Sequence, residues 1–308
     1  MCLPSGFQGS VRNLALHRRE MVKGLIIERR RRLRKDPAKA NRWHFNHGLG
    51  DALMLRSILP AIKHPIVLGV PKGKGYSEIF EGADEVILEE ADDAGEKYYR
   101  IKFPAEDCCL PLDGGRPVKP RFCLEYDFEV IDPTFRIRPL ELDLSDCVHP
   151  GIPKAKSMIH HYGANYVVFH GQGASSPWRK DCPEEIAEVI CKSIVERGYR
   201  VVVIQPDSLG YDFIDEKDIL STEGLPSGAA CLWHVLKGAS AFVGIDSGPL
   251  HMALAIPDLD CMFVKNKIDF MRFFYDAGLE RIREILTVDS TQNETNQTIR
   301  RFLCSKKL

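Results

Sequence analysis

The feature that most constrains the fold is a strand–turn–helix pattern that occurs three times in the chain. Its clearest copy spans residues 241–255, where an apolar stretch, a polar glycine- and proline-containing turn and a second apolar stretch follow one another. Asp246 or Ser247 is suited to cap the helix, and Pro249 suits its first turn. The unpaired N–H groups at such a helix start favour a phosphate group. A turn with a purely structural role remains an alternative for this copy taken alone.

The two other copies strengthen the pattern. In one, an apolar strand at 166–169 leads through a turn rich in Gly and Ser into an amphipathic helix at 183–197. In the other, a strand at 43–46 leads through a glycine-rich turn into a helix at 51–63. Turns of this kind bring ligands to the carboxyl ends of parallel strands. The sequence therefore predicts an α/β protein in which parallel sheets are covered by helices.

The chain of 308 residues is long enough for about two domains. We expect a basic leader at 1–42, a Rossmann-like domain at 43–160, a second Rossmann-like domain at 161–290, and a C-terminal helix at 291–308 that packs back onto the first domain. Residues 104–153 are rich in Pro, Gly and charge, which predicts irregular structure. The remaining expected elements are strands at 65–70, 85–88, 200–205 and 261–264, a helical turn at 76–82, and helices at 231–238 and 298–308.

The turns contain three short motifs, which are Leu49-Gly50-Asp51, Ser175-Ser176 with Lys180 to Pro183, and Asp246 to His251. In these motifs the chain resembles glycosyltransferase family 9, the ADP-heptose:lipopolysaccharide heptosyltransferases. Leu49-Gly50-Asp51 matches a Leu-Gly-Asp turn of that family, and Asp246 to His251 matches its Asp-Thr/Ser-Gly-x-x-His element. Ser175-Ser176 followed by Lys180 to Pro183 is similar to its hydroxyl pair and Lys-x-Trp-Pro element, with Cys182 at the Trp position. The resemblance covers about residues 43–280 and implies a GT-B fold, in which two Rossmann-like domains with parallel sheets face an interdomain cleft.

The resemblance also implies roles for individual residues. It gives Asp51 the role of catalytic base, and it places the donor sugar near Asp246 and His251. The positions that it assigns to the donor diphosphate are Ser175, Ser176, Lys180, Ser247 and Gly248, and those of the acceptor-side turn are His47, Gly48 and Gly50.

Several of these roles have alternatives in the residues themselves. Asp51 is also suited to be a plain N-cap, a role compatible with catalysis, and His47 is the nearest alternative base. His251 lies one helical turn after Ser247, so it either faces the site or fills the helix–sheet contact. Lys180 taken alone would be read as a surface lysine.

Glycosyl transfer requires a base for the acceptor hydroxyl and stabilisation of the leaving diphosphate. Hydroxyl groups, backbone N–H groups and one lysine can supply that stabilisation without metal. The resemblance thus implies an inverting, metal-independent glycosyltransferase that needs no cofactor and takes a nucleotide-diphosphate sugar, with ADP-heptose as a candidate, to the hydroxyl of an unidentified glycolipid, glycan or other acceptor. Two other functions stay open: a sugar-nucleotide-binding module without transfer, and a nucleotide-sugar epimerase or hydrolase on the same fold.

The charge of the chain is unevenly distributed. Residues 11–42 carry twelve Lys and Arg against three Asp and Glu, whereas the net charge of the chain is −1. Such a segment forms a solvated surface helix or attaches to an anionic membrane surface. Nucleic-acid binding is disfavoured because no aromatic residues are interleaved for stacking and the remainder of the chain is acidic.

Cysteine usage and hydropathy indicate the compartment. The ten cysteines show no spacing typical of a metal site, so we expect reduced thiols and no bound metal. No apolar run approaches the roughly 18 residues that span a bilayer. The expected location is the cytoplasm, with peripheral attachment to the inner face of the membrane as the alternative.

Overall fold

The computed structural model describes most of the chain from residue 42 onward. The described residues are 42–61, 65–72, 77–93, 99–100, 140–173, 180–204, 211–214, 217–266 and 281–304. The basic leader, apart from Arg42, and the Ser175–Ser176 pair lie outside the described residues.

A parallel sheet forms the first domain. Its strand order is β3-β2-β1-β4, and its strands are β1 (Arg42–His44), β2 (Ile66–Val70), β3 (Val86–Glu90) and β4 (Tyr99–Arg100). Three helical segments accompany it: α3 (Leu49–Ile58), η1 (Leu59–Ala61) and η2 (Ser77–Ile79). The alternation expected between 43 and 88 is therefore confirmed, with bounds shifted by a few residues and β4 added.

A second parallel sheet forms the other domain, with the order β10-β9-β8-β5-β6-β7. Its strands are β5 (Tyr166–His170), β6 (Arg200–Val203), β7 (Ile219–Ser221), β8 (Ala241–Gly244), β9 (Asp260–Lys265) and β10 (Ile282–Thr287). Every residue of β5 and β8 is buried, as expected for central strands of a parallel sheet that is covered on both faces.

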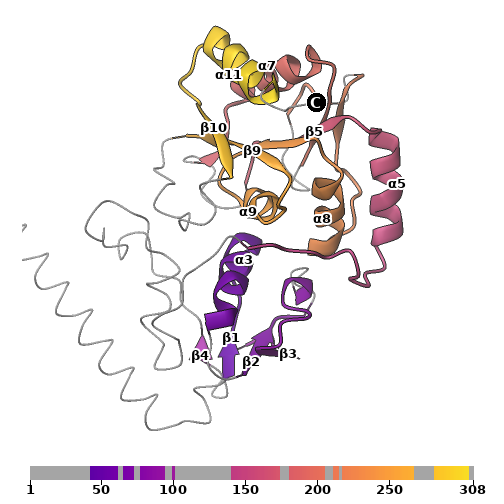
Figure 1. The fold of residues 1–308 in the computed structure, drawn as a ribbon, viewed down its shortest axis with the longest axis vertical. Helices are drawn as coiled ribbons and strands as arrows, with labels where there is room; N and C mark the ends of the chain where they lie inside the picture. Colours follow the sequence, from indigo (N-terminus) through magenta and orange to yellow (C-terminus); the bar gives the residue numbers. More distant parts are fainter. Residues whose placement is uncertain are drawn as a thin grey trace, which may run out of the picture.

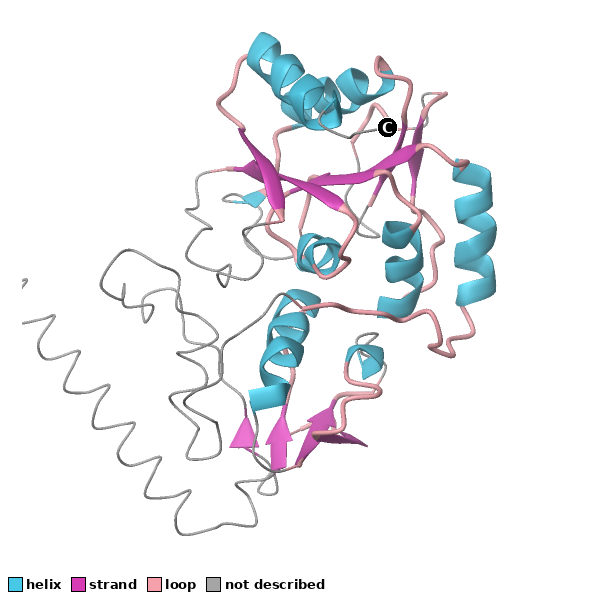
Figure 2. Cartoon of the chain, viewed as in Figure 1, coloured by secondary structure: helices cyan, strands magenta, loops and turns pink. Residues whose placement is uncertain are grey.

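Helices cover both faces of this second sheet (Figure 1). The helices α5 (Ile152–Tyr162), α8 (Ala229–Lys237) and α9 (Gly248–Leu254) lie on the side of the first domain, and α7 (Glu184–Val195) and α11 (Gln292–Cys304) lie on the other side. Figure 2 shows the resulting layers, with strands enclosed between helices in the second domain. One hydrophobic core joins the first sheet to α8 and α9, and the other lies between the second sheet, α7 and α11.

Some elements differ from the sequence-based expectations. The helix α5 begins at Ile152 and packs against α8, so helical structure of the second domain starts before the expected boundary after residue 160. The edge strands β7 and β10 were not expected. The C-terminal helix begins at Gln292 and packs on α7, on the far side of the second sheet, rather than on the first domain as the sequence suggested (Figure 1).

Candidate functional site

The strand order of each sheet reverses at one point. In the second sheet, β5 leads outward to β6 and β7, whereas β8 lies on the opposite side of β5 and leads to β9 and β10. The turns after β5 and β8 therefore flank the point where the strand order reverses, where α/β sheets bind ligands. The first sheet has its reversal at β1, which lies between β2 and β4 and leads into the glycine turn before α3.

The turn after β1 and the turn after β8 meet across the domain boundary. A Cβ atom built on Gly248 would lie 2.7 Å from the Cβ of Leu49, and one built on Gly50 would lie 2.8 Å from Cδ2 of His251. Both distances are shorter than real Cβ contacts, so each glycine permits a close approach of α3 and α9. The structure thus brings the glycine turn at residues 47–50 and the Asp246–His251 segment together.

Asp246 is the centre of a buried charged network at this junction. Its side chain accepts hydrogen bonds from Nζ of Lys180 at 2.9 Å and from Nε2 of His251 at 3.1 Å. Burial raises the pKa of Asp246, but the hydrogen bond and charge of His251, together with Lys180, outweigh burial and hold that pKa below its ordinary value. Because the side chain of Lys180 is only 18% exposed, it belongs to this network and is not an ordinary surface lysine.

Ser247 occupies the N-cap position of α9, but its side chain does not cap the helix. Its Oγ lies 2.8 Å from Nδ1 of His170 and 3.1 Å from the carbonyl oxygen of Ile245. His170 is the last residue of β5 and is buried, and burial lowers its pKa to about 4. The imidazole is therefore neutral near pH 7.

Asp51 lies in the first turn of α3, directly after Gly50. It occupies the N3 position rather than the N-cap, which is Gly48, and its Oδ2 accepts a long hydrogen bond of 3.4 Å from the backbone N–H of Gly48. The carboxylate is partly exposed. The ring of His47 packs against that of Phe45, with the centroids 5.3 Å apart, which ties His47 to the core of the first domain.

Two hydrogen bonds connect the residues that follow β5 with the residues that precede α7. The backbone N–H of Cys182 donates to the carbonyl of Gly171 at 2.8 Å, and that of Gly173 donates to Oδ1 of Asp181 at 2.9 Å. Cys182, at the position of the family's Trp, is buried in the core beside α7. These contacts hold the end of β5 next to Lys180.

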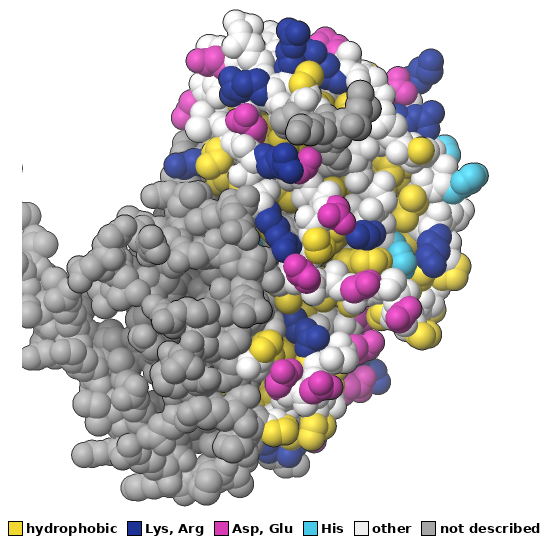
Figure 3. All heavy atoms as spheres, in the orientation of Figure 1, with side chains coloured by type: hydrophobic (Ala, Val, Ile, Leu, Met, Phe, Trp, Pro, Cys, Tyr) yellow, Lys and Arg dark blue, Asp and Glu magenta, His cyan; other side chains and the backbone are white. Residues whose placement is uncertain are grey.

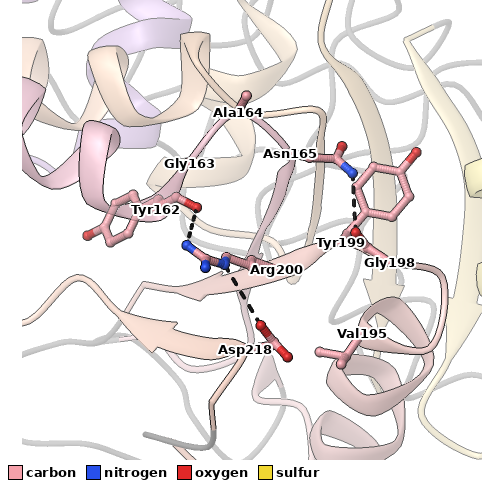
Figure 4. Close-up of a pocket in the computed structure, with 9 residues that line it drawn as sticks. All are labelled: Tyr162, Gly163, Ala164, Asn165, Val195, Gly198, Tyr199, Arg200 and Asp218. Atoms are coloured by element: carbon pink, nitrogen blue, oxygen red, sulfur yellow. Dashed lines mark hydrogen bonds and ion pairs between the residues drawn. The ribbon is translucent and has the colours of Figure 1, made fainter.

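A separate cavity of about 370 Å³ lies at the amino ends of β5, β6 and β7, opposite the strand ends that carry the site (Figure 4). Arg200 at the start of β6 crosses it, donates to the carbonyl oxygens of His161 and Tyr162 at 3.2 Å, and lies 3.8 Å from Asp218. The guanidinium group is thus engaged with the end of α5 and the residue before β7. The cavity contains none of the residues that the sequence nominated, and we assign it a structural role.

The charge pattern on the surface of the described residues adds no residue to the candidate site. On the face shown in Figure 3, acidic and basic side chains of the described residues are interspersed over the second domain. Within the described ranges, no helix is long and apolar enough to cross a membrane, and no group of three or more His, Cys, Asp or Glu side chains is arranged to hold a metal ion.

The sequence analysis missed two residues of this site. His170 stands at the end of a strand next to a glycine turn, a position that could have marked it, but its partner lies 77 residues away. Leu49 was named only as part of the Leu-Gly-Asp motif. Its contact with Gly248 could not be predicted, because that contact depends on how the two domains pack together.

The sequence matches no protein-family model and no curated protein. Among solved structures, a family 9 glycosyltransferase from Veillonella parvula superposes with a TM-score of 0.60 at 11% identity, over 87% of this chain and 98% of that one. The ADP-heptose lipopolysaccharide heptosyltransferase II from E. coli gives a TM-score of 0.58 at 11% identity, over 85% and 97%. Likeness at this identity concerns the fold: the chain has the two-domain GT-B fold of the family 9 glycosyltransferases, as its motifs implied.

Proposed function

We propose that this protein is a glycosyltransferase that uses a nucleotide-diphosphate sugar, with ADP-heptose as the candidate donor. The observation that carries the proposal is the Lys180–Asp246–His251 network, which lies at the reversal point of the second sheet and contacts the α3 turn that bears Asp51. Both similar structures are glycosyltransferases, and one is an ADP-heptose transferase by name, which supports this substrate class. Fold likeness alone would leave the activity open.

The proposed reaction is a single displacement at the anomeric carbon. The carboxylate of Asp51 accepts the proton of the acceptor hydroxyl, whose oxygen bonds to the anomeric carbon. The bond from that carbon to the diphosphate oxygen breaks, and its electron pair leaves with the nucleoside diphosphate. A single displacement inverts the configuration at this carbon.

We propose that Lys180 stabilises the diphosphate as charge develops on it. The charge of Lys180 is balanced by Asp246 at 2.9 Å, so a diphosphate would compete with that carboxylate for the ammonium group. Hydroxyls of Ser175, Ser176 and Ser247 and the N–H of Gly248 are the further proposed donors. Asp246 and His251 would then be available to hydroxyls of the donor sugar.

The test measures transfer from a panel of nucleotide-diphosphate sugars, with and without a chelator. Asp51→Asn should abolish transfer while donor affinity stays near that of the wild type. Lys180→Met should weaken donor binding by about 10- to 100-fold, the usual effect of losing one hydrogen bond to a charged group. Lys192→Met is the matched control, because it removes an exposed lysine–carboxylate pair on α7 with Nζ 2.6 Å from Glu188.

The same assay separates the alternatives. Normal transfer by both Asp51→Asn and Lys180→Met would refute the assignment. Nucleotide binding without turnover of any donor would indicate a binding module, and donor consumption without acceptor would indicate a hydrolase or epimerase. Loss of transfer on chelation would contradict the metal-free scheme.

A further inference from the structure

His170 is fixed in place by the strand that it ends. Its backbone carbonyl accepts a hydrogen bond from the N–H of Ile245 at 3.0 Å, and it pairs with Gly244 in the register of β5 and β8. Its side chain is 4% exposed. The imidazole is therefore held in a rigid position at the carboxyl ends of the two central strands.

The hydrogen bonds of Ser247 determine the tautomer of this imidazole. Oγ lies within hydrogen-bond distance of both Nδ1 of His170 and the carbonyl oxygen of Ile245. A carbonyl oxygen only accepts, and a hydroxyl group has a single hydrogen to donate. Both contacts are satisfied together only when Ser247 donates to Ile245 and accepts from a protonated Nδ1 of His170.

We infer that His170 is a positioning residue for diphosphate binding. In its Nδ1–H tautomer, His170 donates a hydrogen bond to Ser247 and so holds the hydroxyl of Ser247 in place. The inference rests on the proposed function, in which the hydroxyl contacts the donor diphosphate. With Oγ held by the imidazole, the hydroxyl hydrogen can rotate from the carbonyl of Ile245 to a phosphate oxygen without moving the oxygen atom. A bond accepted from His170 also strengthens the bond that the hydroxyl donates.

Burial keeps this imidazole neutral, which the role requires. Burial lowers the pKa of His170 to about 4, so the group carries no charge near pH 7. A neutral imidazole with the hydrogen on Nδ1 is a fixed donor toward Ser247. His170 thus acts through the hydroxyl of Ser247 and not through its own charge.

The first experiment measures the affinity for ADP by calorimetry. His170→Phe should weaken binding about tenfold, and His170→Asn, whose amide nitrogen can replace Nδ1, should restore most of it. Ser247→Ala should cost a similar factor, and the double variant should cost no more than either single one. Tyr166→Phe is the matched control, since it removes a buried hydrogen bond to Val235 at the other end of β5 and should leave ADP affinity unchanged.

The second experiment observes the tautomer in the wild-type protein by ¹⁵N NMR of the histidine rings, with His170→Asn identifying the signal. A protonated Nδ1 is expected, and an Nε2–H tautomer would overturn the inference whatever the protein binds. Additive effects of His170→Phe and Ser247→Ala, or ADP affinity unchanged by His170→Phe, would overturn it as well. If the wild type binds no nucleoside diphosphate, the proposed function fails first and the inference fails with it.

Discussion

Replacing Gly50 by Ala tests the contact between the two domains. The three nearest atoms to the added methyl group all belong to His251, and Cδ2 lies at 2.8 Å. His251 is buried and bonded to Asp246, so its ring cannot move aside without losing that hydrogen bond. Overpacking of this kind costs about 1–3 kcal/mol.

A helix preference acts in the opposite direction. Gly50 is the second residue of α3, where alanine is favoured over glycine by up to about 1 kcal/mol. The steric cost outweighs this gain, so Gly50→Ala should lower the free energy of unfolding by about 1–2 kcal/mol. In a His251→Ala background the methyl group has room, and the same substitution should stabilise the protein by about 0.5 kcal/mol.

The assay is urea denaturation followed by the fluorescence of Trp43 in the first domain and Trp233 on α8. Gly48→Ala is the matched control, because its methyl group would lie 3.9 Å from Asp51, an ordinary contact. Its expected cost at the N-cap is about 0.5 kcal/mol and should not depend on His251. An equal cost of Gly50→Ala in both backgrounds would refute the argument that His251 receives the methyl group.

Three further predictions concern buried titratable groups. His170 has a pKa of about 4 in the folded protein against 6.5 when exposed, so the stability that the protein gains from keeping it neutral is complete above pH 6.5 and is lost as the pH falls toward 4. The free energy of unfolding from urea titrations should fall over this range by up to about 1.4 kcal/mol per pH unit, and His170→Asn should remove that slope. The pKa of Asp246 in the folded protein lies below its ordinary value of 3.8, so the stability that its ionised form contributes is present above pH 3.8 and is lost as the pH falls through the folded pKa. Asp246→Asn should remove that part of the acid unfolding transition, and an unchanged transition would contradict the Lys180–Asp246–His251 network. Glu78 accepts a hydrogen bond from the N–H of Ala230 at 2.6 Å across the domain boundary. Glu78→Ala should lower the free energy of unfolding, measured by urea denaturation, by about 1–3 kcal/mol, and Glu78→Gln should lower it much less; equal losses would show that the hydrogen-bond acceptor is not what matters.

Local patterns predicted much of this fold. The strands β5 and β8 and the turns after them were readable because all their determinants lie within about fifteen consecutive residues. The C-terminal helix α11 was expected too, within a segment at 291–308 but with its helical pattern only from residue 298, whereas it begins at Gln292. Thr291 and Glu294 form a capping box, in which Glu294 accepts from the N–H of Thr291 at 2.8 Å and Thr291 accepts from that of Glu294 at 3.3 Å.

Other features could not be read because they depend on the order of strands in space. The bond from His170 to Ser247 requires β5 and β8 to be neighbours, although β6 and β7 intervene in the sequence. The contact of Glu78 with Ala230 joins residues 152 positions apart. The helix α5 was hidden for a different reason: its buried side chains, such as Ala155 and Tyr162, are few, and it follows a segment rich in proline.

The glycines of the two facing turns show how sequence motif and site are connected. Gly50 and Gly248 are the second and first residues of their helices, where a helical backbone does not by itself require glycine. Their need for glycine therefore comes from the neighbouring domain, whose Leu49 or His251 occupies the space of a Cβ atom. Any motion that separates the domains must first break these contacts, and one of them involves the ring that donates to Asp246. Because a methyl group on Gly50 would meet that ring, Gly50→Ala should alter donor affinity as well as stability.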